Sequence, residues 1–158
     1  MAIKLTLGEV LQKAVQKEIE SQRIYSDLSQ KMTDKAARDA FERGDYLQAF
    51  LLIHSLMESL LRLFLNEADQ EVKFSLLIKK YDQFLDEQNY PVKTLVKELT
   101  EFNRRRNRIV HQLWRKGFSY TNRQAETAAN AALILYSLAI EFLETWDPEI
   151  TRIGFEYT

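Results

Sequence analysis

The stretch EFNRRRNRIVH, residues 101–111, places four arginines just ahead of one of the two histidines in the chain. Six basic residues and one acidic residue lie between Glu101 and Lys116, although the net charge of the whole protein is −1. Apolar residues recur at helical spacing before and after the arginines, which predicts a helix through the stretch. Because a helix turns about 100° per residue, Arg106 and His111 would lie roughly 140° apart on it. One regular helix cannot direct both side chains at the same group, so a shared site would need an irregular helix or a second chain.

The amino-acid composition limits which folds the chain can adopt. The 158 residues are 46% apolar and 28% charged, which suits a soluble protein with one domain or one domain and an appendage. Four glycines and two prolines leave little material for turns and favour a few long helices. We therefore expect an all-α fold: an antiparallel bundle of about five helices over residues 45–158, preceded by an N-terminal helical extension over residues 1–44.

The apolar periodicity gives approximate limits for each helix. We expect helices over 7–32, 34–43, 46–67, 74–86, from Pro91 to just before Gly117, and 122–145. The predicted N-cap residues, which would satisfy free backbone N–H groups, are Thr6 (in a capping box with Glu9), Thr33, Asp45 and Thr121.

Several classes of chemistry have no support in the sequence. The chain has no cysteine, which excludes disulfides, thiolate metal sites and cysteine nucleophiles. No glycine-rich phosphate loop is present. The start carries no apolar run of signal-peptide length, and Glu58, Arg62 and Glu141 interrupt the longest apolar stretches. The prediction is a cytoplasmic protein that contacts no membrane.

Residues 106–111 resemble the Arg-x(4–6)-His motif of HEPN domains, small all-helical proteins that often act as metal-independent ribonucleases. Arg106 matches the motif arginine, Asn107 the polar residue that often follows it, and His111 the motif histidine. The segment from Gly44 to Leu61 also resembles the first core helix of these domains. The resemblance implies a homodimer that brings two motifs into one cleft and cleaves RNA without a cofactor or metal.

The residue types suit that chemistry. RNA cleavage needs a base for the 2′-hydroxyl proton, an acid for the leaving oxygen and a cation beside the charged transition state. Histidine is the residue type that can act as acid or base near neutral pH, and arginine matches phosphate geometry, so His111 and Arg106 would supply these groups. Asn107 would orient the histidine or the phosphate. The remaining basic side chains would either contact the RNA backbone or be ordinary solvated surface charges: Arg104, Arg105, Arg108, Arg115 and Lys116.

This sequence differs from the HEPN pattern at the second residue after the motif histidine. HEPN toxins that pair with nucleotidyltransferase antitoxins tend to carry a tyrosine there, and this chain has Leu113. The modification of that tyrosine cannot occur in this chain, which argues against pairing with a nucleotidyltransferase antitoxin. A toxin–antitoxin or defence role with an antitoxin protein of another kind is still part of the expectation.

Two alternative functions remain. The chain could be a non-catalytic HEPN-like module that binds protein or RNA. The first quarter of the sequence also resembles rubrerythrin and ferritin-like di-iron proteins, in which Glu18 would be a ligand and Glu58 a second one. Such a site needs Glu-x-x-His pairs, and the chain has none. His54 lies among large apolar residues, so we expect a hydrogen-bonded core histidine with Glu58 as its partner.

Overall fold

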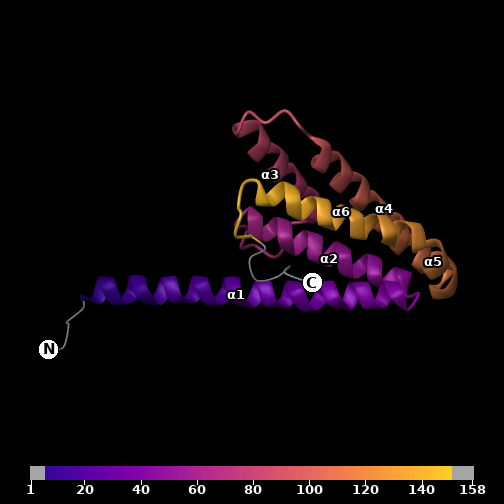
Figure 1. Cartoon of the computed structure of the whole chain (residues 1–158), viewed down its shortest axis with the longest axis horizontal. Coiled ribbons are helices and arrows are strands. Elements are labelled where there is room, and N and C mark those ends of the chain that lie inside the picture. Colours follow the sequence, from indigo (N-terminus) through magenta and orange to yellow (C-terminus); the bar gives the residue numbers. More distant parts are fainter. Residues whose placement is uncertain (1–5, 151–158) are drawn as a thin grey trace.

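The computed structural model describes residues 6–150, but for residues 18–31 it describes only the backbone. This part of the chain is all-α and contains no strand, which confirms the predicted fold class (Figure 1). Its six helices are α1 (Leu7–Glu42), α2 (Tyr46–Phe64), α3 (Phe74–Glu87), α4 (Thr94–Lys116), α5 (Phe118–Gln124) and α6 (Glu126–Glu144).

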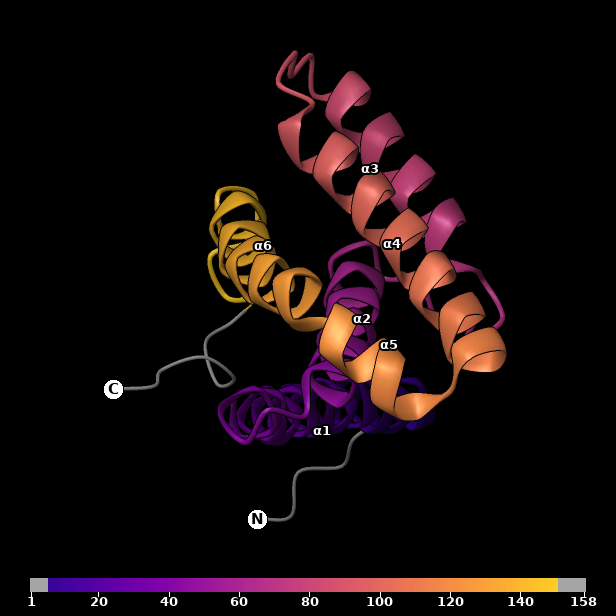
Figure 2. The same cartoon turned by 90° about the vertical axis from the view of Figure 1, so that its right-hand side faces the viewer.

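Helix α2 is the centre of the bundle, because it contacts all five other helices. Its apolar residues face several neighbours at once, as the wide apolar face of its sequence predicts. Helices α3 and α4 run antiparallel beside each other (Figure 2). Large side chains that are almost fully buried form the core: Phe50, Ile53, Met57 and Leu60 of α2, and Leu77, Tyr81, Leu99, Tyr136 and Leu143 around them.

Helix α1 is continuous, so the predicted break at Thr33 is wrong. No glycine or proline lies between Met32 and Arg43, and neighbouring alanines favour the helix strongly enough to carry it through the threonine. The fully buried Ala37 and Ala40 lie in the part of α1 that packs on the bundle. The first half of the helix extends past the bundle (Figure 1), and its described apolar side chains, such as Leu11, are exposed.

The N-terminus of α1 confirms the predicted capping box. The Glu9 N–H donates to Thr6 Oγ1 at 3.2 Å, and the Thr6 N–H donates to Glu9 Oε2 at 3.1 Å. Two of the free N–H groups at this helix end are therefore satisfied locally.

The N-terminus of α2 is capped differently from the prediction. Asp45 stands at the N-cap position, but its carboxylate accepts from Arg43 Nε at 3.2 Å and caps nothing. Instead Asn122 Oδ1 accepts from the Leu47 N–H at 3.0 Å, and its Nδ2 donates to the Gly44 carbonyl at 3.0 Å. An amide from α5 therefore supplies the cap that residue 45 does not.

The end of the chain also differs from the prediction, because residues 118–144 form two helices instead of one. Gly117 has a φ of +82°, a backbone conformation that suits glycine, and α5 begins directly after it. Thr121 is therefore a buried residue inside α5 and not an N-cap. Helix α4 likewise begins at Thr94, later than Pro91, with Lys93 at its N-cap position.

Two helices, α2 and α6, are long and apolar enough to cross a membrane. The charged residues Glu58, Arg62 and Glu141 therefore do not make α2 and α6 too polar to cross a membrane. More than half of the apolar α2 segment is buried inside the bundle, as in the core helix of a soluble protein. About a third of the apolar α6 segment is buried.

Candidate active site on helix α4

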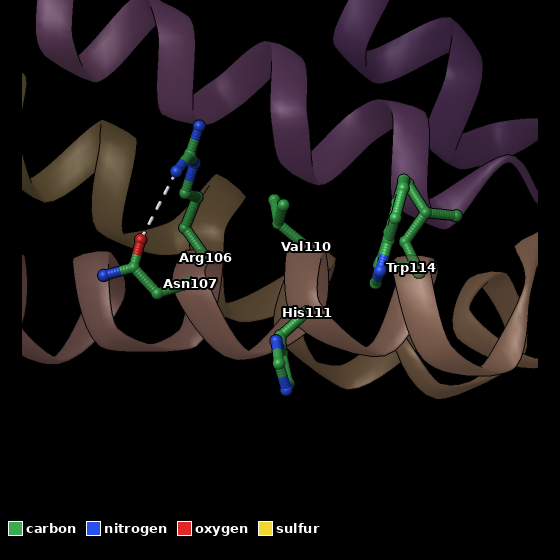
Figure 3. A pocket seen from close by; sticks show the side chains of 6 residues that line it. Arg106, Asn107, Val110, His111 and Trp114 are labelled. Carbon is green, nitrogen blue, oxygen red and sulfur yellow. Dashed lines mark hydrogen bonds between the residues drawn. The ribbon is translucent and has the colours of Figure 1, made fainter.

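Arg106 and His111 lie on the same regular helix and point to different sides of it. Figure 3 shows Arg106, Val110 and Trp114 on one side of α4 and His111 on the other. The helical spacing predicted this separation. Within one chain, the two side chains that carry the proposed chemistry are therefore not directed at a common point.

An open depression of about 520 Å³ surrounds these side chains. Its lining residues all come from α4: Arg106, Asn107, Val110, His111, Leu113 and Trp114. Among the side chains that the structure describes, no other helix contributes to this lining, so within that part of the chain the depression has one wall.

Two large apolar side chains that line the depression are exposed. Trp114 is 89% exposed and Val110 36%. We call these two residues the α4 apolar surface. A nearly fully exposed tryptophan with another exposed apolar side chain one turn away is typical of a surface that another molecule covers.

Asn107 contacts the motif arginine. Arg106 Nη1 donates a hydrogen bond to Asn107 Oδ1 at 3.3 Å, and Figure 3 shows the two side chains turned toward each other. In this structure the asparagine therefore restrains Arg106 and does not bond His111, which is exposed on the opposite side.

Three of the predicted RNA-binding arginines surround a single carboxylate. Arg108 lies 2.9 Å from Glu101, Arg104 3.7 Å and Arg105 3.9 Å. All four side chains are substantially exposed, so these ion pairs are weak and can exchange with a phosphate. The other two predicted contacts, Arg115 and Lys116, are exposed at the end of α4.

His54 is a core residue, as predicted. Its ring stacks on Phe102 at 5.2 Å between centroids and packs on Phe74 at 4.8 Å. The predicted partner is wrong, because Glu58 pairs with Arg62 at 2.9 Å. His54 Nε2 instead lies 3.3 Å from Asn103 Oδ1. Since an amide oxygen only accepts, the histidine donates this bond.

The surroundings of His54 favour its neutral form. Burial lowers the pKa of His54, the hydrogen bond with Asn103 opposes this effect, and the charge of Arg106 lowers the pKa further. The sequence interpretation missed Asn103. Its signal was a polar residue directly after Phe102, on the side of the helix that carries the buried apolar stripe.

No three His, Asp or Glu side chains are grouped closely enough to hold a metal ion among the residues whose side chains the structure describes. Glu18, the first ligand of the di-iron alternative, lies outside them. Glu58, the second, is engaged by Arg62.

Comparison with protein-family models, curated proteins and solved structures finds no match. Fold and site together define an all-α protein with a basic, partly apolar helix surface. The likeness to HEPN domains rests on the motif residues and the α2 segment.

Proposed function

We propose that the protein is a HEPN-type, metal-independent endoribonuclease that cleaves single-stranded RNA in the cytoplasm. Its active site would be composite, with Arg106 and His111 contributed across a homodimer interface. No cofactor takes part. The side chains of two α4 helices would supply the proton transfer and the charge stabilisation.

The observation that carries the proposal is the arrangement of α4. Arg106 and His111 face apart within one chain, and the α4 apolar surface lies beside them (Figure 3). A second copy packed on Val110 and Trp114 would bury these apolar groups and close the open side of the depression. A two-fold axis there would place the same helix of both chains face to face.

The chemistry divides between the two motif residues. His111 would accept the 2′-hydroxyl proton and, once protonated, would donate a proton to the leaving oxygen. Arg106 would contact the scissile phosphate and stabilise the added negative charge. Asn107, through its bond at 3.3 Å, would hold the guanidinium in a defined orientation. The arginines around Glu101 would exchange that carboxylate for phosphates of the bound strand.

The test is cleavage of single-stranded RNA in the presence of a chelator. His111→Ala and Arg106→Ala should each lower the rate by at least about 100-fold, the usual size of a proton-transfer or charge-stabilising contribution. Arg115→Ala is the control, because it removes an exposed charge and should weaken binding mainly at low salt.

An unchanged rate in His111→Ala, or no cleavage by the unmodified protein, would contradict the catalytic proposal. The second candidate function is then an interaction module. The same α4 apolar surface, together with the exposed apolar residues of α1, supports that candidate.

A further inference from the structure

A second cavity lies between α3 and α4, next to the basic stretch. Its volume is about 350 Å³, and we call it the α3–α4 groove. Helix α3 lines it with Ser75, Ile78, Lys79 and Asp82, and α4 with Val96, Thr100, Asn103 and Arg104. Both of these helices, which run antiparallel beside each other (Figure 2), therefore contribute lining side chains, whereas the described lining of the depression at Arg106 comes from α4 alone.

Hydrogen-bond donors dominate the polar lining of the groove. Lys79 forms no ion pair within the described residues, and Arg104 is 72% exposed with its carboxylate partner as far as 3.7 Å away. The one acidic lining residue is Asp82, whose Oδ1 already accepts from Lys93 at 2.6 Å. The groove therefore offers cationic groups while its carboxylate is engaged.

Asn103 adds a fixed donor to this set. His54 donates to its Oδ1 at 3.3 Å, which determines the orientation of the amide and leaves Nδ2 to donate elsewhere. No group in the described part of the chain accepts from Nδ2. A donor-rich cavity of this kind matches a ligand that carries negative charge and several acceptor oxygens.

We propose that the α3–α4 groove binds a backbone phosphate of the RNA strand, beside the phosphate that Arg106 contacts. This inference rests on the proposed ribonuclease function. Asn103 and Arg106 are three residues apart, so the groove and the motif arginine occupy neighbouring positions one helical turn apart. The groove would thereby fix the register of the strand, while Lys79 and Arg104 supply charge.

The experiment measures the affinity of the His111→Ala protein for a fluorescent single-stranded RNA of about 12 nucleotides, within the usual site size of such proteins. Lys79→Ala should weaken binding roughly fivefold and reduce the salt dependence of log K by about 0.7, the loss of one phosphate contact. Lys79→Glu should weaken it further. Asn103→Asp keeps the acceptor for His54 and places a negative charge in the groove, so it should also weaken binding.

Lys97→Ala is the matched control. It removes the same charge from an exposed position on α4 that does not line the groove, and its affinity should stay within about twofold of the parent. Affinities for Lys79→Ala and Lys79→Glu equal to that of Lys97→Ala would overturn the proposal. So would an acidic peptide that binds the groove more tightly than RNA does.

The two proposals fail in different ways. If the unmodified protein cleaves RNA and the Lys79 variants bind normally, the groove assignment is wrong and the ribonuclease stands. If the Lys79 variants bind weakly and the unmodified protein cleaves nothing, the groove is supported and the catalytic role is wrong. Absence of any RNA binding overturns the groove assignment.

Discussion

The Nε2 atom of His54 lies 3.3 Å from Oδ1 of Asn103, and this bond joins the core of α2 to the helix that carries the motif. Asn103 stands three residues before Arg106 on α4, so a residue buried between Phe74 and Phe102 restrains the helix turn next to the proposed phosphate contact. Both the neutral Nε2–H tautomer and the imidazolium can donate this bond, so it is burial in an apolar site, not the bond, that favours the neutral histidine.

Stability should therefore depend on the protonation of His54. Burial lowers its pKa below the ordinary value of 6.5, the Asn103 bond opposes this, and Arg106 lowers it further. As pH falls, the unfolded chain takes up the proton first, so the stabilisation is complete above about pH 6.5 and is lost as the pH falls through the folded-state pKa. Urea unfolding at a series of pH values should show this decrease.

A glutamine at this position keeps a donor and does not titrate. His54→Gln should therefore remove the decrease between neutral and mildly acidic pH, whatever its effect on the absolute stability. His111→Gln, at an exposed position, should retain the decrease. Equal pH profiles for the parent and His54→Gln would show that this histidine does not cause the effect.

Arg62 should contribute to stability far more than the exposed arginines of α4. Its buried guanidinium donates to the Val72 carbonyl at 2.8 Å, to Glu58 at 2.9 Å and to the Asp69 carbonyl, so it holds the loop between α2 and α3. Arg62→Met leaves two carbonyls without their donor and should lower the free energy of unfolding by about 2 kcal/mol. Denaturant unfolding measures this.

Arg108→Met is the control for that substitution. Its side chain is 65% exposed and makes one ion pair, with Glu101 at 2.9 Å. Such surface pairs contribute little, so the change should stay within about 0.5 kcal/mol. A cost of similar size in both variants would contradict the role assigned to Arg62.

Helical periodicity predicted most of the fold because the helices are amphipathic and bury their apolar faces. The limits of α3, predicted as 74–86 and found as Phe74–Glu87, follow from the same pattern. The pattern predicted the capping box of α1 but not the cap of α2, since Asn122 caps α2 from 75 residues away and no local signal identifies such a partner. The break between α5 and α6 lies at the fully buried Ala125, where the sequence has no glycine or proline that would predict it.

The sequence likewise predicted one feature of the candidate site and missed others. The separation of Arg106 and His111 follows from the turn of the helix alone. The bond of Asn107 to Arg106 depends on the rotamers of the side chains, and that of Asn103 to His54 on how α2 packs against α4. The homodimer and the RNA substrate remain predictions.

The two tryptophans should respond to substitution in opposite ways. Trp114 is 89% exposed on the α4 apolar surface, whereas Trp146 packs edge-on against Phe84 and Tyr90 at 5.3 and 5.4 Å between ring centroids. Trp114→Ala should raise the dimer dissociation constant at least about 30-fold, as expected for an aromatic residue central to an interface, and leave the monomer equally stable.

Trp146→Ala should instead lower the free energy of unfolding by about 3 kcal/mol, because it removes an aromatic side chain that packs on two rings. Its dissociation constant should not change. Sedimentation over a range of concentrations, combined with urea unfolding, separates the two effects. A protein that is monomeric at all micromolar concentrations before any substitution would exclude the dimer.

Mixing two inactive variants tests whether the site is composite. An Arg106→Ala dimer would have two motif histidines and no motif arginine. A His111→Ala dimer would have two motif arginines and no motif histidine. After an equimolar mixture has exchanged subunits, roughly half of the dimers contain one of each chain. Only these mixed dimers combine an intact Arg106 with an intact His111, so the mixture should recover part of the RNA cleavage that both parents lack.

Recovery of cleavage in the mixture should require subunit exchange, and Trp114→Ala in both chains should reduce it. If activity stays absent after exchange is verified, the two side chains must act from the same chain, and α4 would have to deform during the reaction.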